Sequence, residues 1–451
     1  MDSENVLLIT VDSLRADHVS FAGHDRPTTP FLSSLAEESA VFTDVVANAP
    51  NTPSSFPAIL TSTHAQMHGG YDYLTAERPF LAEELRRAGY HTLGFHSNPH
   101  LGSDHNYDKG FDRFEDSAEG SQSVASLKDR VERRLDPDSR LYKLLRRVWH
   151  HLSMSTDTGA YAGAGTISEK AVEWIETEGS NSNFFMWLHY MDVHYPFTPD
   201  RDSLLELGME PFSKSRIAEL NARMQENPEE LSESEVVDLL ALYDGEIRYT
   251  DAQIRRVVEV LEANGLLEDT IVILTADHGE AFGEHGQFGH HPELYDELLK
   301  VPLLVYGPDV SPRRVSQQVS LIDLGPTIYD LVGIDTPSKV QGTSFAPLLA
   351  GEQIDEPVAV ITAARDDRLA CRSSEWKYFW RVDEDTTELY DLTSDPNETT
   401  DVSEQHPDVA DSFREILEAH LERVEETKTD SPEVTESTEA KQRLKDLGYV
   451  D

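Results

Sequence analysis

The chain has 451 residues, with 84 acidic against 38 basic side chains and a formal net charge of −46. A surface this acidic repels the phosphate backbone of nucleic acids, which excludes nucleic acid as a partner. Hydrophobic residues make up 38% of the chain, enough for a core, so wholesale disorder is excluded. The single cysteine, Cys371, excludes an internal disulfide and a cysteine-based metal cage.

The excess of acidic side chains also indicates the salt concentration in which the protein works. An acidic surface stays hydrated in concentrated salt, where screening removes the self-repulsion that it suffers in dilute buffer. We therefore expect a halophilic protein from a microbe with a salt-filled, archaeal-type cytoplasm, in preference to an acidic protein of a mesophile. We find no secretory leader and no run of about 18 apolar residues, so we expect a cytoplasmic protein without a transmembrane segment.

The first 342 residues alternate between strand-like and helix-like segments. The predicted strands are residues 5–11, 92–95, 183–189, 270–276 and 301–306. The predicted helices are residues 31–39, 57–61, 80–88, 233–264 and 326–332. Gly265 follows the longest helix, where a glycine commonly ends one. This alternation predicts an α/β fold with a central, mostly parallel or mixed sheet flanked by helices.

A basic stretch interrupts the first domain. Residues 120–160 are expected to be a helical insertion, and residues 130–151 carry arginines opposite a leucine-rich face. A basic amphipathic helix can make peripheral contact with an anionic membrane surface. An insertion that packs on the main domain and pairs its arginines with surplus acids is the favoured alternative.

The pattern changes after Gly342. Short strands are expected at residues 358–363, 372–381 and 388–392, followed by a helix at residues 409–427. We therefore predict a catalytic domain over residues 1–342 and a smaller antiparallel α+β subdomain over residues 343–451. The polar, acidic residues 429–439 are expected to be flexible.

Two of the apolar strands end in acidic side chains. The run from residue 270 closes on Asp277 and His278, and the run from residue 5 closes on Asp12. Open α/β sheets bind ligands at the carboxyl ends of their strands. Carboxylates and an imidazole at one sheet edge are suitable ligands for a divalent cation, so a metal site is expected there.

Four segments, in this order, carry a family resemblance. The first strand with Asp12 is followed by a Thr-Pro-Ser-Ser segment at Thr52, by a Thr-Ala-Asp-His-Gly-Glu segment at Asp277, and by Leu-Tyr-Asp-Leu at residues 389–392. Together they resemble the sulfatase family of the alkaline phosphatase superfamily over nearly the whole chain. The resemblance implies an alkaline-phosphatase-like sandwich with the smaller C-terminal subdomain, and one divalent cation, Ca²⁺, Mn²⁺ or Mg²⁺.

The resemblance also implies roles for individual residues. The metal-ligand positions fall on Asp12, Thr52, Asp277 and His278. The positions that act on the substrate fall on Thr52, His100, His194 and His290. The positions that contact the substrate fall on Arg15, Ser55 and Asn98.

The sequence departs from the family pattern at several of these positions. Sulfatases generally convert a cysteine or serine to formylglycine, but Thr52 cannot be converted because its β-carbon would yield a ketone. Ser55 replaces the arginine of the nucleophile motif, Asn98 replaces a lysine, and Ser13 replaces a second aspartate. A threonine hydroxyl beside a divalent cation is an alternative nucleophile. The resemblance of phosphoglycerol and phosphoethanolamine transferases to such a site favours phosphate over sulfate esters.

We therefore predict a metal-dependent hydrolase of sulfate or phosphate esters with Thr52 as the nucleophile and His194 or His290 protonating the leaving oxygen. The expected substrate is an anionic ester of a glycan, lipid or small molecule. One alternative is a phosphotransferase that acts on glycan or lipid alcohols, and another is a non-catalytic binding protein. Ser54 and Ser55 remain alternative nucleophiles, and Thr52 could instead cap the helix that follows it.

Overall fold

The structure is a computed structural model that describes residues 4–117, 161–354, 359–365, 367–432, 434 and 438–447. The predicted insertion at residues 120–160, with its basic stretch at 130–151, lies outside the described residues.

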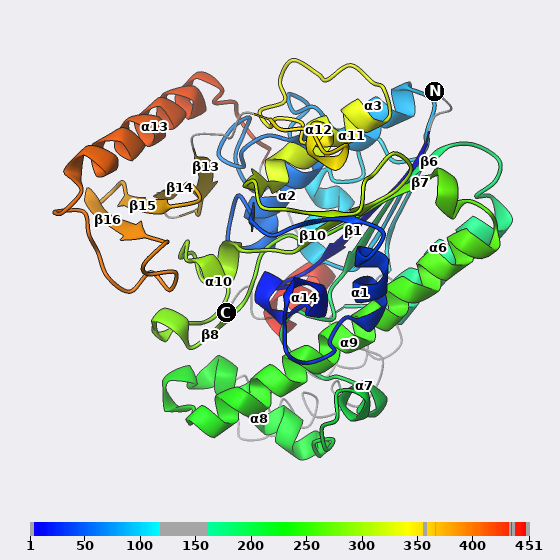
Figure 1. The fold of residues 1–451 in the computed structure, drawn as a ribbon, viewed down its shortest axis with the longest axis horizontal. Helices are drawn as coiled ribbons and strands as arrows, with labels where there is room; N and C mark the ends of the chain where they lie inside the picture. The colour runs from blue at the N-terminus through cyan, green and yellow to red at the C-terminus, as the bar shows by residue number, and fades with distance from the viewer. Residues whose placement is uncertain are drawn as a thin grey trace.

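An eight-stranded mixed sheet forms the centre of the molecule (Figure 1), in the order β11-β2-β10-β7-β1-β6-β4-β5. Strand β10 runs antiparallel to its neighbours β7 and β2, and the other neighbours are parallel. The strands are β1 (Asn5–Val11), β2 (Ala40–Phe42), β4 (His91–His96), β5 (Arg113–Asp116), β6 (Phe184–Tyr190), β7 (Thr270–Ala276), β10 (Leu303–Tyr306) and β11 (Arg313–Val315). The predicted α/β class is confirmed.

The sequences of the three central strands do not alternate between apolar and polar residues, and their burial explains why. Every residue of β1, β6 and β7 is buried, because helices cover both faces of the sheet and each side chain meets an apolar layer. The register pairs Val11 with Tyr190 on one side and with Ala276 on the other. Asp12 and Asp277 therefore emerge at the same edge.

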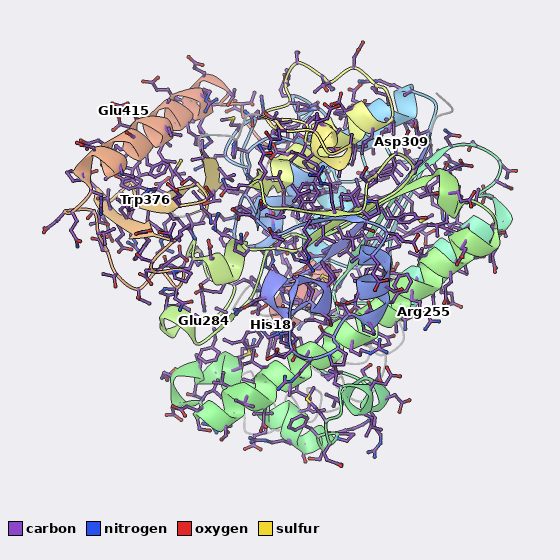
Figure 2. All side chains as sticks on the ribbon, viewed as in Figure 1. His18, Arg255, Glu284, Asp309, Trp376 and Glu415 are labelled. Carbon is purple, nitrogen blue, oxygen red and sulfur yellow. The ribbon has the colours of Figure 1, made fainter. Side chains whose placement is uncertain are left out.

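Helices lie on both faces of this sheet. Figure 1 shows α6 and α9 along one face and α2, α11 and α12 on the other, and Figure 2 shows side chains filling the space between. The helices are α1 (Pro30–Ala36), α2 (Thr52–Thr61), α3 (Leu81–Arg87), α6 (Ala164–Thr177), α7 (Arg201–Glu206), α8 (Lys214–Glu226), α9 (Glu233–Ala263), α10 (Asp296–Leu299), α11 (Leu324–Leu331) and α12 (Ala346–Leu349). Within the described chain, no helix is long and apolar enough to cross a membrane.

A second, antiparallel sheet follows with the strand order β13-β14-β15-β16. Its strands are β13 (Val360–Ala363), β14 (Arg368–Arg372), β15 (Trp376–Arg381) and β16 (Thr386–Asp391), with α13 (Pro407–Glu426) packed on it. The single strand expected at residues 372–381 is wrong. The Ser373 hydroxyl accepts the backbone N–H groups of Glu375 and Trp376, and the resulting turn divides the segment into the end of β14 and all of β15.

Buried ion pairs join the second sheet to the first unit. Lys377 of β15 lies 2.8 Å from Asp296 of α10 and 2.7 Å from Glu398. Arg372 of β14 lies 3.0 Å from Asp296 and 3.1 Å from Asp44. Because breaking one partner of a buried pair is costly, this network fixes the second sheet against the catalytic unit.

Two features near the C-terminus differ from a simple two-domain division. The Phe345 ring packs 5.0 Å from Phe42 of β2, so the first core continues beyond residue 342. Helix α14 (Thr438–Asp446), absent from the sequence-based predictions, places Arg443 2.5 Å from Asp116 at the end of β5. The division at residues 342/343 and the flexibility of residues 429–439 stay predictions.

Candidate active site

Three distant segments converge at the carboxyl edge of the central sheet. Asp12 follows β1, Asp277 and His278 follow β7, and one ligand atom from each of the three lies within 4.8 Å of the others. Thr52, at the start of α2, places its Oγ1 3.2 Å from Asp12 Oδ2 and 3.2 Å from His278 Nε2. All four side chains are 0% exposed. The structure thus brings together the four residues expected to hold the cation.

Thr52 is the first residue of α2 and does not cap this helix. Asn51 is the N-cap, and its side chain accepts the backbone N–H of Ser54 at 3.3 Å. The prediction that Thr52 could cap the helix is therefore wrong. The backbone N–H groups of Ser54 and Ser55 are bonded to Asn51, whose side chain and carbonyl close the first turn of α2.

The orientation of His278 is fixed by its own loop. Its Nδ1 lies 2.8 Å from the carbonyl oxygen of Gly279, which can only accept, so Nδ1 carries the proton. The Nε2 of the neutral ring is then left with a lone pair directed at the site. Burial lowers the pKa of His278 to about 4, which keeps this nitrogen available as a ligand.

The two carboxylates of the site differ in how readily they bind a proton. Burial and the charge of Asp12 raise the pKa of Asp277 well above its ordinary value. Burial would also raise the pKa of Asp12, but a hydrogen bond with His189 and the charges of His194 and His278 hold it well below its ordinary value. Two carboxylates and a lone-pair imidazole within 4.8 Å form a donor set that fits one divalent cation, whose ligands lie within roughly 5 Å of each other.

Two further side chains contact the Asp12 carboxylate. Asn98 Nδ2 donates to Asp12 Oδ2 at 3.1 Å, and His189 Nε2 lies 3.2 Å from the same oxygen. Sequence reasoning missed His189, although it is a polar residue in the otherwise apolar and aromatic strand β6. Its pairing with Thr10 in the sheet register brings it beside Asp12, which sequence alone does not reveal.

The structure gives the predicted histidines different surroundings. The His290 ring lies 4.8 Å from the His194 ring and 5.0 Å from the His278 ring, so these three form one cluster. His100 is half-buried on a short 3₁₀ turn, where its backbone N–H donates to Asn98 Oδ1 at 2.9 Å and its ring lies 6.1 Å from His105. Burial lowers the pKa of His100 to about 3.

The resemblance assigns Ser55 and Arg15 to substrate contact. In the structure, both side chains bind other residues of the protein. The Ser55 hydroxyl donates to the carbonyl oxygen of Asp277 at 2.7 Å. Arg15 pairs with Asp17 at 2.8 Å and Glu284 at 2.7 Å, and donates to the carbonyl oxygen of Glu280 at 3.0 Å. These contacts tie the turn after β1 to the loop that follows Asp277.

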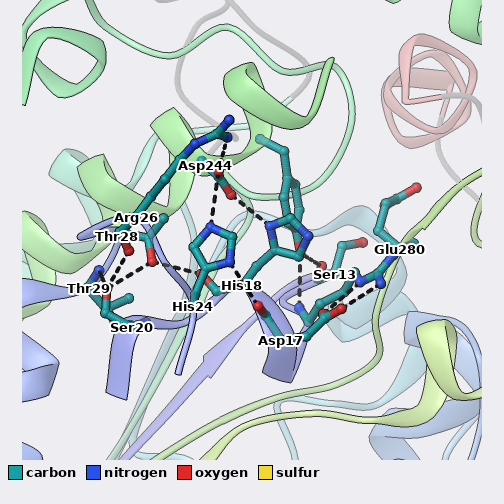
Figure 3. Close-up of polar contacts among 12 residues, drawn as sticks. Ser13, Asp17, His18, Ser20, His24, Arg26, Thr28, Thr29, Asp244 and Glu280 are labelled. Atoms are coloured by element: carbon teal, nitrogen blue, oxygen red, sulfur yellow. Dashed lines mark hydrogen bonds and ion pairs between the residues drawn. The ribbon is translucent and has the colours of Figure 1, made fainter. Parts of the chain in front are cut away.

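A second group of potential ligands lies beside this turn. His18 and His24 lie 2.7 Å and 3.3 Å from the Asp244 carboxylate, and Arg26 lies 2.5 Å from it (Figure 3). Because the Arg26 guanidinium already pairs with the Asp244 carboxylate, we interpret this group as a structural ion-pair cluster that holds residues 18–26 against α9.

Comparisons with known proteins identify the family. Residues 4–334 match the family described as Sulfatase, and residues 283–427 match the C-terminal region of N-sulphoglucosamine sulphohydrolase. The chain belongs to the sulfatase family. The resemblance stated from the motifs is confirmed, and this sulfatase is an enzyme of the sulfuric ester hydrolase class.

Several relatives span most of this sulfatase. Arylsulfatase K of Bos taurus is 24% identical over 463 residues, covering 92% of this chain and 81% of the relative. The phosphonate monoester hydrolase of Agrobacterium radiobacter has a TM-score of 0.72 at 20% identity, covering 93% of this chain and 96% of its own. A protein solved with its substrate D-glucosamine-2-N,6-O-disulfate has a TM-score of 0.72 at 18% identity, with 96% and 100% covered. The solved structures confirm the fold.

Proposed function

We propose that this sulfatase cleaves sulfate or phosphate esters through attack by the Thr52 hydroxyl. The observation that carries the proposal is the position of Thr52 Oγ1, 3.2 Å from both Asp12 Oδ2 and His278 Nε2. The Ser55 hydroxyl is engaged with the Asp277 carbonyl, and Ser54 Oγ has no hydrogen-bond partner in the described part of the chain. The contacts with Asp12 and His278 are therefore made by Thr52 and not by the two serines.

Asp12, Asp277 and His278 would hold the divalent cation that the family normally binds. It would supply positive charge beside the Thr52 hydroxyl and the anionic group of the substrate. Two oxygen donors and one nitrogen donor suit Mn²⁺ and Mg²⁺ as well as Ca²⁺.

Different residues of the chain accept and donate the protons of the reaction. A bond forms between Thr52 Oγ1 and the sulfur or phosphorus as the ester bond to the leaving oxygen breaks, and the hydroxyl proton of Thr52 leaves along its contact with Asp12 Oδ2 or His278 Nε2. His290 is the better donor to the leaving oxygen, because its contact with Glu280 raises its pKa although burial alone would lower it. Burial lowers the pKa of His194, which suits it to accept a proton or a hydrogen bond from the substrate.

The covalent intermediate on Thr52 distinguishes the ester classes. A formylglycine hydrate releases sulfate by elimination, in which the second hydroxyl on the same carbon re-forms the aldehyde, and this route is closed to threonine because its β-carbon carries only one oxygen. Water must displace the group from Oγ1 at sulfur or phosphorus instead, which favours phosphate or phosphonate esters. The likeness in fold to the phosphonate monoester hydrolase supports this range.

Transfer to an acceptor alcohol is the second candidate function. The same threonine nucleophile would carry the group to a glycan or lipid hydroxyl in place of water. Added glycerol separates the two: a phosphoglycerol product indicates transfer, and inorganic sulfate or phosphate alone indicates hydrolysis.

The test is a screen of nitrophenyl sulfate, phosphate and phosphodiester esters in molar KCl with Mn²⁺, Mg²⁺ or Ca²⁺. Thr52→Ala should reduce kcat by at least about 10³-fold, and Thr52→Ser should retain part of it because it keeps the hydroxyl. Ser54→Ala is the matched control and should leave kcat unchanged. Full activity in Thr52→Ala, or a loss confined to Ser54→Ala, would overturn the proposed nucleophile.

The cellular location and the wider substrate class stay predictions. A cytoplasmic location, a sulfated or phosphorylated glycan or lipid as substrate, and membrane contact through residues 130–151 rest on the sequence alone.

A further inference from the structure

A row of hydrogen-bonded side chains inside the sheet ends on the Asp12 carboxylate. Trp187 Nε1 donates to Thr10 Oγ1 at 3.0 Å, and Thr10 Oγ1 lies 3.0 Å from His189 Nδ1. His189 Nε2 then lies 3.2 Å from Asp12 Oδ2. All four side chains are fully buried, so water does not compete for these contacts.

The direction of these bonds follows from what each group can donate. The Trp187 indole nitrogen only donates, and a carboxylate only accepts, so His189 Nε2 must carry a proton toward Asp12. In the neutral ring, Nδ1 accepts the Thr10 hydroxyl proton. In the protonated ring, Thr10 can turn its proton to the carbonyl oxygen of Leu188 at 3.3 Å. Nε2–H therefore faces Asp12 in both states.

Packing holds the imidazole in this orientation. The His189 ring meets the Phe56 ring edge-on, with centroids 4.9 Å apart, and stacks at 26° to Trp187 with centroids 6.0 Å apart. These two ring contacts, together with the Thr10 contact at Nδ1, restrict the rotation of the imidazole. The carboxylate must instead align with the ring.

We propose that His189 is a positioning residue of the cation site, which fixes the rotation of the Asp12 carboxylate. This inference rests on the proposed function, because it assumes that Asp12 binds the cation. Asp12 Oδ2 accepts hydrogen bonds from Asn98, His189 and Thr52. Asp12 Oδ1 accepts the Ser13 hydroxyl at 3.2 Å and lies 3.6 Å from His278 Nε2. Asn98 and His189 thus fix the position of Oδ2, and with it the position of Oδ1 beside His278. Hydrogen-bonded partners of metal ligands commonly contribute 10- to 100-fold in metal affinity.

The experiment measures Mn²⁺ affinity by calorimetry on the full chain in molar KCl, after removal of metal with a chelator. His189→Asn keeps a polar side chain that is too short to reach Asp12, and should weaken Mn²⁺ binding by about 10- to 100-fold. His189→Gln carries its amide nitrogen near the place of Nε2, and should restore most of the affinity. His96→Asn is the control, because His96 is equally buried and also stacks on Trp187, with centroids 5.8 Å apart.

The readouts separate this inference from its alternatives. Equal Mn²⁺ affinity in wild type and His189→Asn would overturn the positioning role, as would equal losses in His189→Asn, His189→Gln and His96→Asn. The Mn²⁺ measurement involves no turnover, so a wrong nucleophile would leave this test intact. A wild-type protein that binds none of Mn²⁺, Mg²⁺ and Ca²⁺ would overturn both the cation site and the role of His189.

Discussion

The hydroxyl of Tyr243, in the middle of α9, donates to the carbonyl oxygen of Ser13 at 2.6 Å and accepts the backbone N–H of Arg15 at 2.9 Å. Ser13 occupies the left-handed region with φ of 57°, a conformation that L-residues other than Asn, Asp and Gly seldom adopt. The long helix therefore holds the strained turn that directly follows Asp12.

Removing this hydroxyl should destabilise the turn. We expect Tyr243→Phe to lower the free energy of unfolding by about 1–3 kcal/mol, because a buried carbonyl and a buried N–H lose their partner. Urea unfolding in molar KCl measures the change. Tyr306→Phe is the control, because Tyr306 is only partly buried at the end of β10. Equal effects in both variants would contradict the role of the contact.

Ser13 also offers a way to change the choice of metal. Its N–H lies 3.4 Å from Asp277 Oδ1 and its hydroxyl 3.2 Å from Asp12 Oδ1, at the place where many sulfatases carry a second aspartate. Ser13→Asp should tighten Ca²⁺ binding, because Ca²⁺ takes more oxygen ligands than Mg²⁺. It should also destabilise the metal-free protein, since a third carboxylate joins two buried ones. Calorimetry with Ca²⁺ and unfolding with a chelator test both; Ser13→Asn, which adds no charge, is the matched control.

The ion pairs around Asp244 predict two pH ranges of stability. Burial would raise the pKa of Asp244, but His18, His24 and Arg26 hold it well below its ordinary value. Its contribution is therefore present above about pH 4 and is lost as the pH falls through the folded-state pKa. The hydrogen bond to Asp244 raises the pKa of His24, so the contribution of His24 is present below about pH 6.5 and is lost as the pH rises through its folded-state pKa.

We expect Asp244→Asn to cost about 3 kcal/mol near pH 6, with a smaller difference from wild type in acid. Unfolding measured from about pH 3 to pH 9 tests the shape of the difference. Asp25→Asn removes the same charge from an exposed neighbouring position and should show no such profile. A difference that is constant across this range would contradict the assignment.

The net charge of −46 predicts a strong dependence on salt. Raising KCl from dilute buffer to molar concentration should raise the Tm, because the Debye length falls from about 30 Å at 0.01 M to about 3 Å at 1 M and removes repulsion among surface carboxylates. Differential scanning calorimetry measures the shift, and sucrose at matched osmolality controls for effects other than screening. A Tm that does not respond to KCl would contradict the halophilic interpretation.

The sequence predicts the centre of the fold best where one physical cause dominates. Strands β1 and β7 are apolar on both faces and end in acids, so their place in a buried parallel sheet, and the meeting of Asp12 with Asp277, follow from pattern alone. The end of α9 at Gly265, with φ of 68°, is likewise a local signal.

The errors occur where distant contacts decide. His189 contacts Asp12 because β1 pairs with β6. Residues paired in these two strands, such as Val6 and Phe185, are 179 positions apart in the sequence. The turn at Ser373 is made by a side-chain oxygen that accepts two nearby N–H groups, a feature hidden within a run of strand-forming residues. Asn51 and not Thr52 caps α2, and the Thr52 side chain contacts the Asp12 carboxylate instead. The sequence alone does not show which of these two adjacent residues is the cap.

The burial of the sole cysteine has a practical consequence for labelling. Cys371 is 0% exposed within β14, and burial raises the pKa of its thiol to about 12, so maleimide reagents find almost no thiolate there. Val237→Cys would place one reactive thiol on α9 at a position whose side chain is 55% exposed. A fluorophore or spin probe can thus be attached at one chosen position, with the native cysteine left in place.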